Sequence, residues 1–282
     1  MNSVSVTGKS WIVKEYDREQ LISYKDNFSL DEIIAKLLIL RNIKKEEIKS
    51  FLNPSLKNFL PNPSILHDMD KSSLRTIRSI DKNEKIGILG DYDVDGATST
   101  ALLGKYFTEL DLEYEIYIPD RETEGYGPSI KGIDELISKN VKLIFTVDCG
   151  TLSFDTINFA KNKNIDVIVL DHHQSEINLP KAYTVVNPNK LDDKSKLNYL
   201  CAAGVSFMFL VSLNRSLRSV NWFNKNKKKE PRLIDYLDLV SLGTVCDVVP
   251  LVGLNRAIVK QGLKILKKKK NLGLKTLLDI CK

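Results

Sequence analysis

Short apolar segments rich in isoleucine, valine and tyrosine alternate with segments of helical periodicity in the middle of the chain. The apolar segments are Lys85–Leu89, Tyr114–Pro119, Val141–Val147, Asp166–Leu170 and Tyr183–Val186. Their length and composition are typical of strands that are buried on both faces. Apolar residues spaced three or four apart, as in amphipathic helices, occupy the segments Thr98–Leu110, Ile130–Ser138 and Ser153–Lys163 between them. The alternation predicts an α/β fold in which a parallel sheet is flanked by helices.

Helical patterns also lie on both sides of this α/β region. Those before it are Leu30–Leu40, Lys45–Leu52 and Asp68–Asp81, and those after it are Cys201–Leu213, Leu233–Leu242 and Asn255–Lys268. Pro54, Pro61 and Pro63 mark turns in the first group. We therefore expect a helical N-terminal lead-in over residues 1–82 and one larger domain over residues 83–282.

Composition excludes several classes of protein. Hydrophobic residues make up 43% of the 282 residues and charged residues 28%, which is typical of a folded globular protein and not of a disordered one. The longest apolar stretch, Cys201–Leu213, is shorter than the roughly 18–20 residues that cross a bilayer, so no membrane span is predicted. Residues 1–14 have no basic segment leading into an apolar one. We therefore expect no secretory signal and a cytoplasmic location.

The charge of the chain is distributed unevenly. Residues 1–150 contain 20 basic and 25 acidic residues, whereas residues 151–282 contain 22 basic and 11 acidic residues. A basic surface attracts polyanions, so this asymmetry favours a partner such as a nucleic acid. Lys225–Lys229 and Lys267–Lys270 are the densest basic runs, and such runs are more often solvated surface than binding sites.

Polar clusters follow four of the predicted strands at the point where each strand ends. They are Gly90–Gly96, Asp148–Gly150, Asp171–His173 and Asn187–Asn189. In open α/β sheets, ligands bind at the carboxyl ends of the strands. Carboxylates that converge in a partly buried place repel one another unless a positive charge compensates them. The sequence therefore predicts a site for divalent cations at this edge of the sheet.

The ligand types narrow the choice of metal. Aspartate oxygens with one or two imidazoles favour Mn²⁺ or Mg²⁺ over structural Zn²⁺, and the adjacent pair His172 and His173 tilts the choice toward Mn²⁺. The four cysteines (Cys149, Cys201, Cys246 and Cys281) lack zinc-site spacing, and we expect them to be reduced, mostly buried thiols. Asp247 lies among apolar residues, where a buried charge must be paired or bound to metal.

A calcium loop is the competing interpretation of the run Asp91–Gly96, because D-x-D-x-D-G opens an EF-hand. That loop requires a glutamate at its twelfth position, which here is Leu102, and a helix before it, where the sequence predicts a strand. Both requirements fail, so we do not expect an EF-hand.

Four motifs in this order make the chain recognisable: DYDVDG at 91–96, VDCG at 147–150, DHH at 171–173 and GTVCDVVPL at 243–251. Together they resemble the DHH phosphoesterase superfamily and, within it, the RecJ branch of single-strand-specific exonucleases. Other branches place a histidine four residues before the aspartate that matches Asp93, where this chain has Leu89. The segments Pro119–Arg121 and Glu124–Gly127 also resemble RecJ.

The resemblance implies a dinuclear site of two Mn²⁺ or Mg²⁺ ions. Asp91, Asp93 and Asp148 would bind one metal, Asp95, His172 and Asp247 the other, and Asp148 would bridge. His173 would orient the substrate phosphate or a carboxylate. The implied catalytic residues are Asp148, His172 and His173. The implied substrate-binding residues are Arg121, Tyr126, His173 and Asn189.

The resemblance implies a metal-dependent exonuclease that releases mononucleotides from the 5′ end of single-stranded DNA, in DNA repair and recombination. One alternative is a DHH phosphodiesterase for short oligonucleotides or cyclic dinucleotides, and another is a truncated, non-catalytic DNA-binding relative. RecJ proteins continue into DHHA1 and OB-fold domains, which we expect to be absent here and which would complete the DNA cleft. Single-strand-binding proteins and helicases are the candidate protein partners.

Overall fold

The computed structural model describes residues 4–10, 12 and 14–281. The chain divides into two compact units, residues 1–54 and residues 55–282. The first unit is small and helical, and the second contains the whole sheet. Each unit is described below by itself.

A five-stranded sheet forms the centre of the second unit, with the strand order β2-β1-β3-β4-β5. The strands are β1 (Lys85–Gly90), β2 (Tyr114–Tyr117), β3 (Val141–Val147), β4 (Asp166–Leu170) and β5 (Thr184–Val186). Every neighbouring pair is parallel, and all five strands overlap the predicted apolar segments. This confirms the predicted α/β fold.

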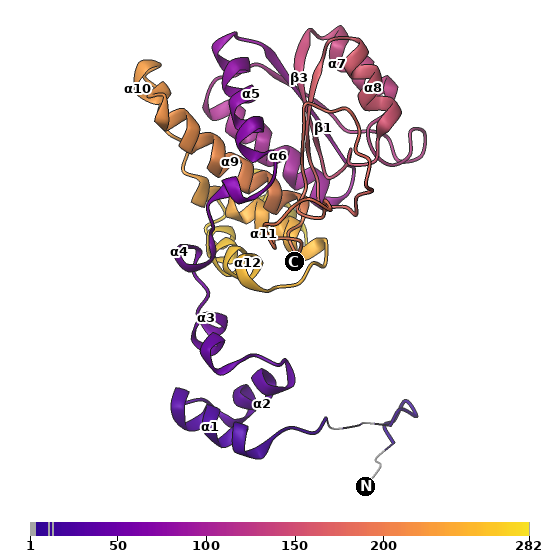
Figure 1. Cartoon of the computed structure of the whole chain (residues 1–282). Helices are drawn as coiled ribbons and strands as arrows, with labels where there is room; N and C mark the ends of the chain where they lie inside the picture. Colours follow the sequence, from indigo (N-terminus) through magenta and orange to yellow (C-terminus); the bar gives the residue numbers. More distant parts are fainter. Residues whose placement is uncertain (1–3, 11, 13, 282) are drawn as a thin grey trace. The chain divides into compact units, whose positions relative to one another are not determined.

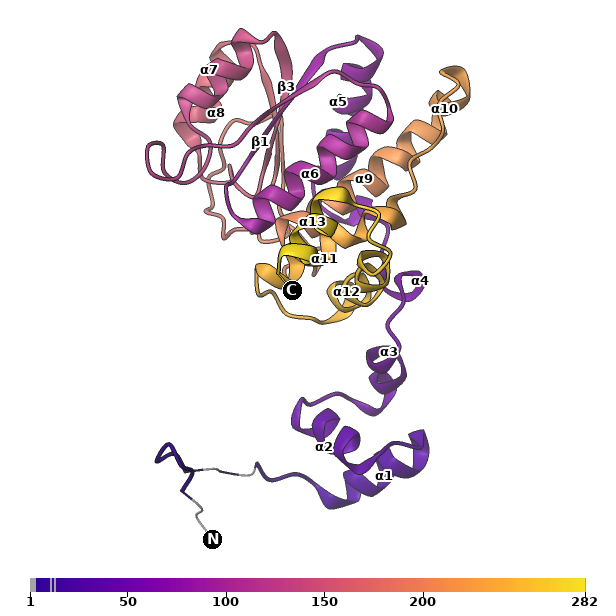
Figure 2. The ribbon, with the colours of Figure 1, turned by 180° about the vertical axis from the view of Figure 1, so that it is seen from behind.

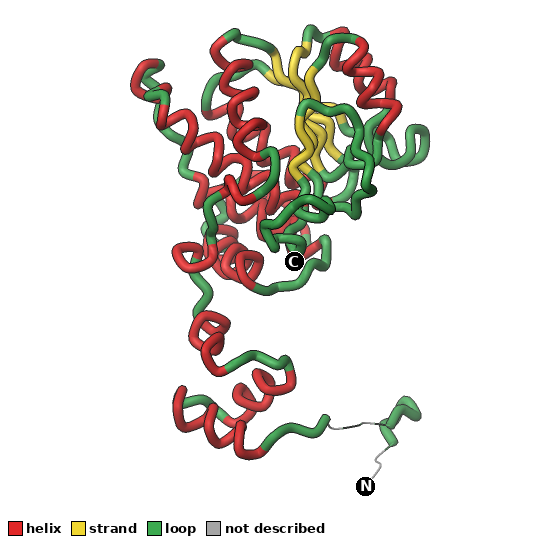
Figure 3. The backbone as a smooth tube through the Cα atoms, viewed as in Figure 1, coloured by secondary structure: helices red, strands yellow, loops and turns green. Residues whose placement is uncertain are grey.

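Helices cover both faces of this sheet, which Figure 1 shows in ribbon form and Figure 3 shows as yellow strands between red helices. One face carries α5 (Met69–Asp81), α6 (Val94–Glu109) and α9 (Ala202–Ser219), and the other carries α7 (Ile130–Ser138) and α8 (Phe154–Asn162). The remaining elements of this unit are α4 (Leu56–Phe59), η2 (Pro63–Ile65), α10 (Trp222–Lys225), η3 (Leu233–Tyr236), α11 (Leu237–Cys246), α12 (Gly253–Leu266) and α13 (Leu272–Ile280). Helix α11 packs against α6, α9 and α12 (Figure 2).

Two hydrophobic clusters, one on each face, hold the helices to the sheet. Successive strand residues point to opposite faces, so Ile88 belongs to the cluster under α6 and α9 and Leu89 to the cluster under α7 and α8. On the α9 side, the rings of Phe145 and Phe209 lie 5.2 Å apart between their centroids. On the other side, α7 buries Ile133 and Leu136, one helical turn apart. Strands buried on both faces need apolar residues at every position, which accounts for the continuous apolar segments of the sequence.

The first unit consists of α1 (Arg18–Phe28), α2 (Glu32–Leu40), the 3₁₀ turn η1 (Lys45–Glu47) and α3 (Ile48–Leu52). Tyr24, Leu38 and Ile48 are buried in its core, and the hydroxyl of Tyr24 donates to the carbonyl of Ile43 at 2.8 Å. The structure confirms the helical segments predicted here, and α1 is an additional helix. The predicted lead-in over residues 1–82 spans both units, because residues 55–82, including α5, belong to the unit of the sheet.

Among the described residues, no helix is both long and apolar enough to cross a membrane.

Cys149 and Cys201 are buried, whereas Cys246 and Cys281 are exposed, and all four are free thiols. The prediction of buried thiols therefore holds for two of the four.

Candidate metal centre

The register of the sheet aligns the polar residues that follow its strands. Gly90 pairs with Val147, Val147 with Leu170, and Leu170 with Val186. The next residue along each strand is Asp91, Asp148, Asp171 and Asn187, respectively. Parallel strands end at the same edge, so these four side chains form a row across the sheet.

Two helices add further acids to this row. Asp93 and Asp95 lie at the start of α6, where Asp93 Oδ1 accepts a hydrogen bond from the amide of Gly96 at 2.9 Å and caps the helix. Asp247 follows the last residue of α11, which packs against α6. The structure therefore brings together acids that lie more than 150 residues apart in the sequence.

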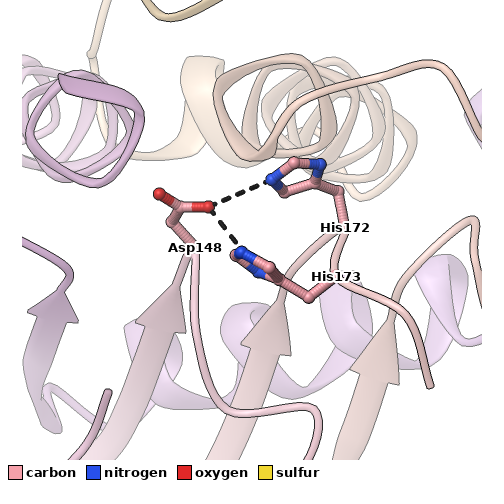
Figure 4. A group of neighbouring side chains, drawn as sticks. All are labelled: Asp148, His172 and His173. Atoms are coloured by element: carbon pink, nitrogen blue, oxygen red, sulfur yellow. Dashed lines mark ion pairs between the residues drawn. The ribbon is translucent and has the colours of Figure 1, made fainter. Parts of the chain in front are cut away.

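His172 lies at the centre of these acids. Its Nε2 atom lies 3.3 Å from Asp148 Oδ1, 3.6 Å from Asp247 Oδ2 and 3.8 Å from Asp95 Oδ2. Figure 4 shows the rings of His172 and His173 directed toward the Asp148 carboxylate, which follows β3. One carboxylate thus faces two imidazoles.

The turn after β3 depends on unusual backbone angles. Asp148 has a φ of +62° and Gly150 a φ of +112°. Aspartate tolerates the left-handed region better than most side chains, and glycine is suited to the second position. A Cβ atom on Gly150 would also lie 2.5 Å from Thr146 Oγ1. The sequence VDCG therefore suits a tight turn that presents the Asp148 carboxylate.

The carboxylate of Asp95 also binds the start of α9. It accepts hydrogen bonds from the amides of Ala202 at 2.6 Å and Ala203 at 3.0 Å. A negative charge at a helix N-terminus is stabilised by the helix dipole. Asp95 thus ties α6 to α9 while its Oδ2 atom remains near His172.

A second network supports the two histidines from the sheet. His173 Nδ1 donates to Asp171 Oδ1 at 2.8 Å, and the Asn187 side-chain amide donates to the His173 carbonyl at 2.9 Å. The Asn189 side-chain amide donates to the His172 carbonyl. Asp171 also accepts from the amide of Thr151 at 3.0 Å.

The centre is electrostatically unfavourable without a cation. Burial raises the pKa of Asp148 to about 10, and the charges of Asp95 and Asp93 act in the same direction. Burial likewise raises the pKa values of Asp91, Asp95 and Asp247 above the ordinary range for aspartate. A carboxyl group that is neutral at pH 7 is an indication that a compensating charge is required for its ionised form.

Asp171 behaves differently from these acids. Burial would raise its pKa, but the hydrogen bonds from His173 and Thr151 bring the pKa down to about 2. The same Asp171 contact raises the pKa of His173. Asp171 therefore remains ionised and holds the His173 ring through Nδ1.

Four buried polar atoms of the centre have no hydrogen-bond partner among the residues that the structure describes: Asp91 Oδ1, Asp148 Oδ1, His172 Nε2 and Asp247 Oδ2. Buried polar atoms without partners are rare and require an explanation. Three groups of ligand atoms, each with all its members within 4.8 Å of one another, are Asp91–Asp93–Asp148, Asp95–His172–Asp247 and Asp148–His172–His173. Carboxylate oxygens with imidazole nitrogens suit Mn²⁺ or Mg²⁺, so the residues present fit divalent cations.

The predicted metal ligands and the predicted substrate-binding residues differ in how closely the structure brings them together. The six predicted metal ligands lie together, and His173 lies at their edge with its side chain 46% exposed. The Tyr126 hydroxyl donates to the Asp148 carbonyl at 2.9 Å and lies 3.2 Å from the His173 ring nitrogens. The guanidinium carbon of Arg121 lies 5.4 Å from the centroid of the Tyr92 ring. Tyr92 lies between Asp91 and Asp93 in the sequence. Asn189 supports the backbone of His172, and a substrate contact by it stays a prediction.

Sequence reasoning missed the supporting residues. Asp171, Asn187 and Thr151 are buried and bonded to one another or to the histidines; the sequence placed Asp171 and Asn187 in clusters at this edge but assigned none of the three a supporting role. Their position directly after strands was the available signal for Asp171 and Asn187. The strand before Asp91 and the burial of Leu102 within α6 agree with the exclusion of an EF-hand.

Comparison with known proteins relates this geometry to a family. Residues 85–244 match the family model described as "DHH family, N-terminal domain". The chain is 39% identical over 215 residues to the single-stranded-DNA-specific exonuclease RecJ of Haemophilus influenzae, which covers 75% of this chain and 36% of that protein. It is 31% identical over 271 residues to RecJ of Bacillus subtilis, which covers 96% of this chain and 32% of that protein. The chain thus spans about a third of the length of these relatives.

Solved structures give the same relationship. A crystal structure of exonuclease RecJ bound to manganese is 31% identical with a TM-score of 0.65, covering 76% of this chain and 52% of that one. RecJ from Thermus thermophilus in complex with Mn²⁺ is 26% identical with a TM-score of 0.72, covering 93% of this chain and 35% of that one.

Proposed function

Because the chain belongs to the DHH family, we propose that it carries the catalytic part of a RecJ-like exonuclease. The proposed reaction is hydrolysis of phosphodiester bonds of single-stranded DNA from the 5′ end, with two Mn²⁺ or Mg²⁺ ions, in DNA repair and recombination. The observation that carries this proposal is a set of four buried atoms without a hydrogen-bond partner in the part of the chain that the structure describes, on Asp91, Asp148, His172 and Asp247, all at one edge of the sheet. The similar structures of RecJ bound to manganese support the same assignment.

In this proposal, residues 83–282 form the DHH portion, and its side chains divide into two ligand sets. Asp91, Asp93 and Asp148 would hold one cation, and Asp95, His172 and Asp247 the other. Cations bound there would neutralise charge on the scissile phosphate and lower the pKa of an attacking water. The proposal is supported by the position of Asp148, whose Oδ1 atom belongs to the row of acids and also faces His172.

The remaining residues would bind and orient the substrate. His173 donates through Nδ1 to Asp171, which orients its ring, and its Nε2 atom would donate to the phosphate. Arg121 would contact phosphate through its planar guanidinium group. Tyr126 would contact the substrate beside His173, since its side chain is exposed there.

The basic half of the chain supports a polyanionic substrate. Residues 151–282 carry 22 basic residues and 11 acidic ones. Binding through phosphates predicts that the affinity for DNA falls as the salt concentration increases.

An enzyme of this kind needs a source of single strands, so we also propose helicases and single-strand-binding proteins as partners, and a cytoplasmic location with the DNA.

A digestion assay tests the proposal. The chain is mixed with Mn²⁺ and single-stranded DNA labelled at the 5′ or the 3′ end, and release of 5′-terminal mononucleotides is expected. Asp148→Ala should abolish this release, whereas Asp134→Asn, an exposed acid on α7, should leave it unchanged. Digestion by Asp148→Ala at the wild-type rate would contradict the assigned centre.

Two further substrates separate the alternatives. Faster turnover of a dinucleotide or cyclic dinucleotide than of a long strand would favour a small-substrate phosphodiesterase. Binding of Mn²⁺ and DNA without hydrolysis of any of these substrates would favour a non-catalytic role.

A further inference from the structure

The loop of residues 118–129, between β2 and α7, reaches the metal centre without being part of it. It carries Tyr126, whose hydroxyl donates to the Asp148 carbonyl at 2.9 Å and whose ring meets that of His173 edge-on at 5.7 Å. Pro119, Gly127 and Pro128 are buried at the ends of the loop, where the Thr156 hydroxyl donates to the Pro128 carbonyl at 2.9 Å, but residues 120–123 before Glu124 are exposed. The segment that leads into Tyr126 therefore depends on polar contacts.

Glu124 supplies contacts to both ends of this loop. Its Oε2 atom accepts hydrogen bonds from the hydroxyl of Tyr117, at the end of β2, at 2.6 Å and from the hydroxyl of Ser129, the N-cap of α7, at 2.8 Å. Its Oε1 atom faces the amide of Asp120 at 3.3 Å and Lys131 Nζ at 3.4 Å. One carboxylate thus joins the strand, the loop and the following helix.

The environment of Glu124 differs from that of the neighbouring acid. Its side chain is only 9% exposed, whereas Glu122 is exposed on the same loop. The hydrogen bond from Tyr117 is the main reason why the pKa of Glu124 falls to about 2, so this group is ionised throughout the working range of a nuclease. Charge-assisted hydrogen bonds of this kind are roughly twice as strong as neutral ones.

The backbone around Tyr126 depends on this anchor. Gly125 and Gly127 have φ values of +77° and +85°, and a Cβ atom on Gly125 would meet nothing within 4 Å. Two glycines permit many conformations, so they do not by themselves select the one in which Tyr126 reaches Asp148. Glu124, directly before this segment, fixes its starting point.

We propose that Glu124 is a positioning residue, which holds the loop 118–129 in the conformation that places Tyr126 against Asp148 and His173. This inference rests on the proposed function, because the substrate would be bound beside His173. The contacts that the structure describes for the Glu124 carboxylate are with Tyr117, Asp120, Ser129 and Lys131, none of which is a proposed metal ligand. Its loss would allow the loop to move while leaving the sheet and the six acidic and imidazole ligands in place.

The test compares Glu124→Gln and Glu124→Ala with Glu122→Gln, which makes the same chemical change on an exposed acid of the same loop. Hydrogen exchange of the peptide 118–129 should become faster in both Glu124 variants and not in the control. The value of kcat/KM on single-stranded DNA should fall about 10- to 100-fold, because a displacement of about 1 Å at a site can have such an effect. The affinity for Mn²⁺, measured by calorimetry, should stay within twofold.

A double-mutant cycle with Tyr117→Phe tests the route of the effect. If Glu124 acts through Tyr117, the double variant should lose much less activity than the two single losses multiplied together. Unchanged loop exchange in both Glu124 variants, or a fall in Mn²⁺ affinity as large as the fall in kcat/KM, would overturn the proposal. If the wild-type chain digests no DNA, the proposed function fails, and the exchange measurement still decides whether Glu124 holds the loop.

Discussion

Replacing Asp148 by asparagine should stabilise the chain in the absence of metal, and most of this advantage should disappear in its presence. Asparagine has nearly the same shape and tolerates the φ of +62° found at this position, so the turn after β3 is preserved. The substitution replaces an ionisable carboxyl group by a neutral amide on a side chain that is only 2% exposed and surrounded by other acids. The folded state is therefore changed mainly in its electrostatics.

The magnitude follows from the pKa of Asp148, which rises from the ordinary value of 3.8 to about 10. A carboxyl group with a raised pKa in the folded state destabilises that state progressively as the pH rises above 3.8. The interval from 3.8 to pH 7 corresponds to about 4 kcal/mol. Asparagine removes this term but buries an amide, which leaves a net gain of about 2–3 kcal/mol.

The assay is thermal unfolding at pH 7, followed by circular dichroism, in EDTA and in Mn²⁺. In EDTA, Asp148→Asn should unfold about 4–12 °C above the wild-type chain, since 1 kcal/mol shifts the Tm of a domain of this size by about 2–4 °C. In Mn²⁺ at 100 times its Kd, the wild-type chain should gain about 2.7 kcal/mol and the variant much less. In Mn²⁺ the Tm of the wild-type chain should therefore approach or exceed that of Asp148→Asn.

Asp134→Asn, which removes an exposed charge from α7, is the matched control. It should change the Tm by no more than about 1 °C, both in EDTA and in Mn²⁺. A wild-type chain that is more stable than Asp148→Asn in EDTA would refute the reasoning, because burial and the neighbouring acids would then not disfavour the ionised Asp148 carboxylate. Equal stabilisation of both proteins by Mn²⁺ would show that Asp148 does not bind the metal.

Two other substitutions separate the centre from the rest of the fold. Gly243→Ala would place a Cβ atom 2.7 Å from Asp95 Oδ1, so we expect a loss of about 1–3 kcal/mol in urea unfolding together with weaker Mn²⁺ binding; full Mn²⁺ affinity would contradict this. Arg75→Ala should cost about 2–3 kcal/mol, because buried Arg75 bonds Asp166 at 2.5 Å and Glu84 at 2.8 Å. Since Asp166 lies at the other end of β4, Mn²⁺ titration of this variant should match the wild type, and a large change would show that the centre depends on this ion pair.

Much of the architecture could be read from local patterns. Each strand of the second unit is a short apolar segment, and a strand buried on both faces cannot be built from anything else. Helices were predicted where their apolar residues recur every three or four positions, as for Ile133 and Leu136 in α7. Helix α13, in which no described residue is buried, was not predicted, although its sequence contains four leucines and an isoleucine.

The sequence by itself also determined which edge of the molecule carries the chemistry, because parallel strands bring all their carboxyl ends to the same side. Asp91, Asp148 and His172 follow strands, so their proximity was predictable before any contact was known. Only the tertiary structure decided which contacts the side chains from other elements make. Asp247 reaches His172 because α11 packs on α6, and Glu124 reaches Tyr117 because the chain folds back after β2. The physical reason is that periodicity reports the face of an element that is buried, whereas the packing of one element on another depends on contacts between residues far apart in the chain.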